Sequence, residues 1–165
     1  MTSAAEIAAA LDEDLTNLRD PRVRAGIQAF RLAAPAPIRL AWDYGKPGET
    51  FDGWLVFDDP EHRKGIAYCD QGFGPKNPWG IIITGETCPS MGMDCGWFRR
   101  FIDAYMDSFS AADLPIWRVV RWTSSDRSRE PITGELAWEE AWEMVYRLRA
   151  EEPSYFYSCE HDIAY

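Results

Sequence analysis

The chain has 165 residues, of which 46% are hydrophobic, and this length and composition predict one compact domain over residues 1–165 with a sizeable core. Its 27 acidic residues against 17 basic ones give a net charge of −10, which repels a phosphate backbone and argues against direct binding to nucleic acid. No run approaches the ~18 apolar residues of a membrane span, and the N-terminus lacks the basic region of a signal or transit peptide, so we expect a cytoplasmic protein with free thiols.

Two helices are predicted at the N-terminus. Ser3 and Glu6 form a capping box ahead of the first helix, and Asp20-Pro21 supplies an N-cap and a first-turn proline for the second. Each helix carries one apolar stripe, which predicts a helical hairpin that covers one side of the domain. The stripes are Ile7, Leu11, Leu15 and Leu18 in the first helix and Val23, Ile27, Phe30 and Ala34 in the second.

Four short strands are predicted after the hairpin. From Ile38 onward the apolar residues alternate with polar ones, which is typical of a half-buried strand. Turn-forming residues separate this strand from three further apolar runs, and such short connections predict an antiparallel meander. The four strands are expected at residues 38–44, 51–57, 66–69 and 79–84.

The C-terminal part alternates helices and strands. A third helix is expected to begin at Asp94 and to end before Pro115, and a fourth to be capped by Thr133 and to end before Pro153. Strands are predicted at residues 116–122 and 155–159. The fold class is therefore α+β: an N-terminal helical hairpin, a four-stranded antiparallel meander, then α-β-α-β, with the helices packed on a six-stranded, mostly antiparallel sheet.

The loop YCDQGFGPKNPWG at residues 68–80 resembles a phosphate-binding turn in composition only. A dinucleotide fingerprint that starts at Gly72 has Asn77 where its third glycine belongs, and no helix follows. A nearby stretch with Walker A spacing has Glu86 in place of the lysine. We therefore predict a rigid connector whose rings Phe73 and Trp79 contact a partner.

Cysteine and histidine positions leave two alternatives open. Cys95 is expected at the start of the third helix, where the helix dipole favours a thiolate, so a small cysteine-dependent enzyme or redox protein is one alternative. A zinc-stapled structural domain is the other, with Cys88, Cys95, Cys159 and His161 as ligands. The turn at residues 58–62, which includes His62, is interpreted as a solvated hairpin tip. No complete catalytic motif is present and no cofactor is predicted.

Acidic and aromatic residues point to a protein partner. Residues 101–165 hold 13 acidic residues against 6 basic ones, whereas residues 1–100 hold 14 against 11, so the acidic field centres on the C-terminal third. The chain also has 8 Trp, 7 Tyr and 8 Phe, more rings than one core readily hides. The leading hypothesis is an acidic inhibitor or immunity-type protein that neutralises a basic partner such as a toxin or nuclease. Besides the loop, its contacts are expected at Glu135, Glu139, Glu143, Trp138 and Trp142.

Overall fold

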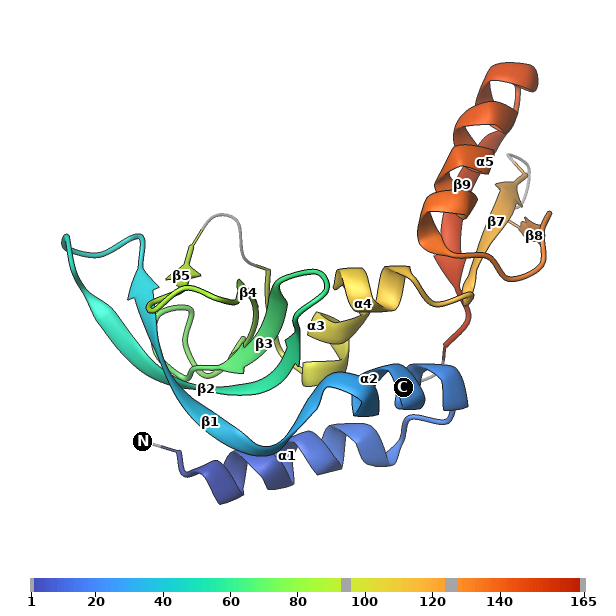
Figure 1. Ribbon diagram of the computed structural model, residues 1–165. Coiled ribbons are helices and arrows are strands. Elements are labelled where there is room, and N and C mark those ends of the chain that lie inside the picture. The colour runs from blue at the N-terminus through green and yellow to red at the C-terminus, as the bar shows by residue number, and fades with distance from the viewer. Residues whose placement is uncertain (1, 93–95, 124–127, 164–165) are drawn as a thin grey trace. The chain divides into compact units, whose positions relative to one another are not determined.

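The computed structural model describes residues 2–92, 96–123 and 128–163 (Figure 1). The chain divides into two compact units, Met1–Ala111 and Ala112–Ala164, which are described separately below. Whether these units fold together as one domain stays a prediction. The helices in the described part of the chain all fall short of the length and apolar character that a membrane crossing requires.

The N-terminal helical hairpin is confirmed. Helix α1, Ala4–Thr16, begins with the capping box, in which the Glu6 amide donates to the Ser3 hydroxyl at 3.3 Å and the Ser3 amide donates to the Glu6 carboxylate at 2.7 Å. Helix α2, Pro21–Phe30, is capped by Asp20, whose pKa is lowered to about 2 mainly by the side-chain hydrogen bond from Arg22. Helix α2 ends four residues before the predicted stripe does, because in a continued helix the Pro35 ring would clash with the Arg31 carbonyl, and Pro35 also favours extended backbone at Ala34.

The first unit contains a six-stranded, curled sheet with the order β5-β1-β2-β3-β4-β6 (Figure 1). The predicted meander is confirmed, since β1 to β4 pair with their sequence neighbours in antiparallel register. Short edge strands complete the sheet, with β5 parallel to β1 and β6 antiparallel to β4. The strands are β1 Arg31–Trp42, β2 Thr50–Asp59, β3 Lys64–Tyr68, β4 Trp79–Ile83, β5 Ser90–Met91 and β6 Trp97–Phe98.

The predicted third helix is replaced by β6 and two short helices, α3 Phe101–Met106 and α4 Phe109–Ala112. Its expected cap, Asp94, lies outside the described residues. Among the described residues of the first unit, apolar side chains pack in at least two places. In one, Phe57 of β2 contacts rings of α2 and α3; in the other, sheet and loop residues pack on one another, with Leu40, Ala67, Cys69, Ile82 and Met91 at the centre.

The second unit is a three-stranded antiparallel sheet with one helix packed on it. Its strands are β7 Trp117–Trp122, β8 Arg129–Pro131 and β9 Phe156–His161, in the order β8-β7-β9. The strands predicted at 116–122 and 155–159 therefore exist, but they pair with each other instead of joining the meander. Helix α5, Trp138–Glu151, packs through Ala141 and Val145. The α+β class is confirmed.

Helix α5 begins at Trp138, five residues after its predicted cap Thr133. The Thr133 hydroxyl oxygen instead accepts a hydrogen bond from the Val119 amide at 3.0 Å, so it ties its loop to β7. At the other end of the helix, the Arg149 guanidinium donates to the Tyr157 carbonyl oxygen of β9 at 2.6 Å. These hydrogen bonds add to the apolar packing: one holds the loop that precedes α5 against β7, and the other holds α5 itself against β9.

Candidate functional site

Helix α5 brings together the aromatic residues that the sequence singled out, although Trp142 also packs against the apolar cluster of the second unit and has the Arg149 guanidinium 5.9 Å from its ring centroid. Trp138 and Trp142 are one helical turn apart, with ring centroids at 5.9 Å, and Tyr146 continues the row at 5.8 Å from Trp142. Trp138 is 40% exposed and Tyr146 is 65% exposed, while Trp142 is half-buried. The row therefore offers a contiguous aromatic surface on a rigid helix.

Two carboxylates flank this row. Glu139 and Glu143 are both exposed, and within the described part of the chain neither forms an ion pair. The ion pair that spacing allows between Glu143 and Arg147 is not formed there either. We define the α5 surface as Trp138, Glu139, Trp142, Glu143 and Tyr146. It combines ring faces with uncompensated negative charge, which suits lysine and arginine side chains.

Glu135 lies just before α5 and differs from the other two glutamates. Its carboxylate is 3.8 Å from the Arg118 guanidinium, which also lies 3.6 Å from Asp162. Its charge is thus partly compensated within the second unit. Glu140, which was not singled out, accepts a hydrogen bond from the Ala137 amide at 3.1 Å and stabilises the start of the helix.

Of the two loop residues expected to contact a partner, only Phe73 lies at the surface. Phe73 is 36% exposed, stacks on Trp97 at 5.5 Å and meets the edges of Trp42 at 5.1 Å and Tyr44 at 5.9 Å. Tyr44, which the sequence reasoning did not select, is 56% exposed. Its place at the end of the alternating run 38–44, on the same side as Trp42, was the available signal.

Trp79 was expected to lie at the surface as a partner contact, and this expectation is wrong. Its side chain is only 3% exposed, so it is buried in the first unit. Its ring packs against Tyr68 at 5.0 Å and Phe101 at 5.6 Å, because β4 turns this position toward α3. The loop's glycines have a structural use, since Gly72 and Gly74 have φ of 63° and 84°, in the left-handed region. The connector interpretation of this loop fits these angles.

The turn between β2 and β3 is only partly the solvated tip that the sequence suggested, since Pro60 and Glu61 are exposed but Asp59 is not. Asp59 is fully buried, and its carboxylate accepts hydrogen bonds from the Ser110 hydroxyl at 2.5 Å and from two backbone amides of the turn, at 3.1 and 3.3 Å. His62 Nδ1 lies 2.8 Å from the same carboxylate, and the imidazole stacks on Phe109. Burial raises the pKa of Asp59, but the hydrogen bonds from Ser110 and His62 lower it overall.

This arrangement orients an imidazole without building a nucleophile. The Ser110 hydroxyl donates to the carboxylate, whereas nucleophilic catalysis needs the hydroxyl on the imidazole. The Asx turn that Asp59 makes with the two following amides was recognisable from Asp-Pro turn chemistry. Ser110 was not, because it lies 51 residues away in the sequence.

The cysteine alternatives stay predictions. Cys95 lies outside the described residues. Cys88 belongs to the first unit, and Cys159 and His161 to the second. Among the described residues, no three His, Cys, Asp or Glu side chains gather as metal ligands.

Burial is the main cause of the pKa shifts of Cys159 and His161, the two C-terminal members of the predicted zinc ligand set. It raises the pKa of the Cys159 thiol to about 11 and lowers the pKa of His161. The Cys159 thiol is therefore protonated at neutral pH, which makes it a poor nucleophile.

Comparison with family models, with curated proteins and with solved structures gives no match to this chain.

Proposed function

We propose that the protein is a binding module for a basic protein partner, of the inhibitor or immunity type, and that the α5 surface is its main contact. The observation that carries this proposal is the pair of exposed carboxylates, Glu139 and Glu143, which form no ion pair with any described residue, beside a row of three aromatic rings. Aromatic anchors dominate many protein interfaces, and acidic groups around them steer a basic partner and fix its register.

The charge distribution supports the same partner class. The chain carries a net charge of −10, and residues 101–165, which include α5, hold 13 acidic residues against 6 basic ones. A merely solvated helical face accounts for the glutamates but not for Trp138 at 40% and Tyr146 at 65% exposure. Large rings exposed together on one helix are more typical of an interaction surface.

Charge reversal on α5 tests the proposal. Wild-type protein immobilised as bait in lysate of its source is expected to capture a basic protein, and Glu139→Lys/Glu143→Lys is expected to weaken that capture by about a hundredfold or more. Quantitative mass spectrometry of the bound fraction measures both. The matched control is Glu13→Lys/Glu61→Lys, which makes the same change in net charge at exposed positions of the first unit and should leave capture nearly unchanged.

Two results would contradict the proposal: capture of no basic protein, or equal capture by the α5 variant and its control. Once the captured protein is purified, its association rate should fall steeply between low and high salt, because screening shortens the reach of the acidic field. An association rate that does not change with salt concentration would contradict electrostatic steering of the partner.

Phe73→Ala separates a contact role of the loop from an architectural one. The ring is partly exposed but touches three other rings, so we expect the free energy of unfolding to fall by about 1 kcal/mol. Affinity for the captured partner is expected to fall by about 2 kcal/mol. Urea unfolding and the capture assay measure the two losses. If stability falls more than affinity, the loop is only a structural connector.

A further inference from the structure

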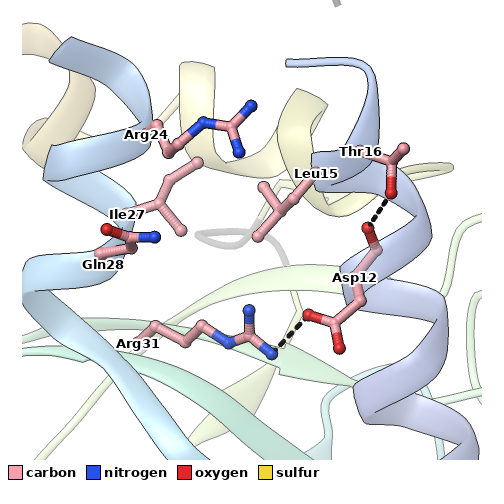
Figure 2. Close-up of a pocket in the computed structure, with 7 residues that line it drawn as sticks. All are labelled: Asp12, Leu15, Thr16, Arg24, Ile27, Gln28 and Arg31. Atoms are coloured by element: carbon pink, nitrogen blue, oxygen red, sulfur yellow. Dashed lines mark hydrogen bonds and ion pairs between the residues drawn. The ribbon is translucent and has the colours of Figure 1, made fainter. Parts of the chain in front are cut away.

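A pocket of about 180 Å³ lies between α1 and α2 in the first unit (Figure 2). Its residues are spaced one helical turn apart along the facing sides of the two helices. The arginines Arg24 and Arg31 lie at opposite ends, with the apolar side chains Leu15 and Ile27 between them (Figure 2). The full lining is Asp12, Leu15 and Thr16 from α1, Arg24, Ile27 and Gln28 from α2, and Arg31, where β1 begins.

The two ends of the pocket differ in charge. Arg31 donates to the Asp12 carboxylate at 2.7 Å, so that guanidinium is compensated. Arg24 donates to the backbone carbonyl oxygen of Leu18 and forms no ion pair within the described residues. A guanidinium has five N–H donors, so Arg24 keeps several for a ligand. One end therefore carries an uncompensated positive charge.

The local sequence sets this pocket apart from the rest of an acidic chain. Residues 19–31 contain four arginines and one aspartate, although the whole chain has a net charge of −10. The two lining arginines also tie the hairpin together: Arg24 donates to the Leu18 carbonyl oxygen in the loop between α1 and α2, and Arg31 links α1 to β1. These contacts do not involve the exposed Gln28 side chain or the half-buried Leu15 side chain, which remain available to a ligand.

We propose that this pocket binds a small organic acid, with its carboxylate on the Arg24 guanidinium and a short apolar body over the half-buried Leu15 side chain, beneath which Ile27 is fully buried. The volume of about 180 Å³ corresponds to about six water molecules of liquid, hence to about six non-hydrogen atoms of ligand. Arginine binds carboxylates in a bidentate geometry. Inorganic phosphate fits less well, because it has no apolar body and the Asp12 carboxylate repels a dianion.

Titration of the full chain with butyrate, followed by ¹H–¹⁵N NMR of the arginine Nε–H groups and the α1 and α2 amides, tests this site. We expect saturable shifts with a dissociation constant on the order of 1–10 mM. 1-Butanol, which lacks the charge, and inorganic phosphate, which lacks the apolar body, are each expected to bind about tenfold more weakly or not at all.

Two variants separate ligand binding from a structural role. Arg24→Gln should weaken butyrate binding about tenfold, while Arg19→Gln, an equal charge change on the same hairpin outside the pocket lining, should not. Asp12→Asn releases Arg31 and removes the repulsive carboxylate, so it should tighten butyrate binding several-fold. If the Arg31–Asp12 ion pair only stabilises the helical hairpin, Asp12→Asn should not increase the affinity for butyrate.

The proposal is overturned if butyrate gives no saturable shift in the pocket, if phosphate or butanol binds as well as butyrate, or if Asp12→Asn does not tighten binding. Circular dichroism of each variant confirms that it is folded before titration. Should Arg24→Gln unfold the hairpin, the Asp12→Asn result and the comparison of the three ligands still decide.

Discussion

Phe57→Ala is expected to lower the free energy of unfolding by about 3–5 kcal/mol, the usual cost of deleting a buried aromatic ring. Phe57 is 1% exposed, and its ring contacts Phe30 of α2 at 5.9 Å and Phe101 and Tyr105 of α3 at 6.4 and 5.6 Å. It is thus the point at which the sheet, α2 and α3 meet. Urea unfolding followed by far-ultraviolet circular dichroism measures the loss, and a value below about 1 kcal/mol contradicts this central role.

The same experiment tests the prediction that residues 1–165 form a single domain. Val145→Ala truncates a fully buried side chain of the second unit and serves as the matched variant. If the units fold together, each variant lowers the midpoint of one shared transition. Two transitions, of which Phe57→Ala moves one and Val145→Ala the other, would mean two domains.

Asp59→Ala is expected to destabilise the protein by about 2–4 kcal/mol. It leaves the Ser110 hydroxyl, the turn amides and His62 Nδ1 without the buried acceptor they share. Asp59→Asn keeps one acceptor oxygen and should cost less. Glu61→Gln, in the same turn but exposed, is the control and should be near neutral. Thermal and urea unfolding at pH 7 measure all three, and equal stability of Asp59→Ala and wild type would show that the cluster is dispensable.

The pH dependence follows from the lowered pKa of Asp59. A carboxylate whose pKa is lower in the folded than in the unfolded chain stabilises the fold above its unfolded value and loses that contribution as pH falls through the folded value. Wild type should therefore lose more stability than Asp59→Asn as pH falls below about 4. Parallel losses in the two proteins would show that Asp59 contributes nothing to this dependence.

Elements fixed by local chemistry were predictable from the sequence. The capping box at Ser3, the Asp20-Pro21 helix start and the turns of the meander each act over a few residues, and all are present. The pairing of β7 with β9 was not predictable, because it depends on which apolar faces meet across about 35 residues of chain. Periodicity identifies both strands but leaves the choice of sheet open.

In the candidate sites, too, features set by local sequence could be predicted, whereas features that depend on distant segments could not. The α5 surface could be predicted, since one helix carries all its residues at fixed spacing. Burial of Trp79 and the bond from Ser110 to Asp59 could not, because each depends on segments distant in the sequence. The α1–α2 pocket was equally hidden: its arginines lay outside the apolar stripes, and only the hairpin geometry sets them opposite α1.

Both edges of the second unit's sheet are protected against a further strand. At β8, exposed Arg129 and Glu130 are followed by Pro131, which has no amide to donate. At β9, the Arg149 guanidinium donates to the Tyr157 carbonyl oxygen, so this backbone acceptor is already engaged. These features disfavour aggregation through open edges and recognition by β-strand addition. Under the proposed function, the side chains of the α5 surface, rather than backbone groups of a sheet edge, are the contacts with the partner.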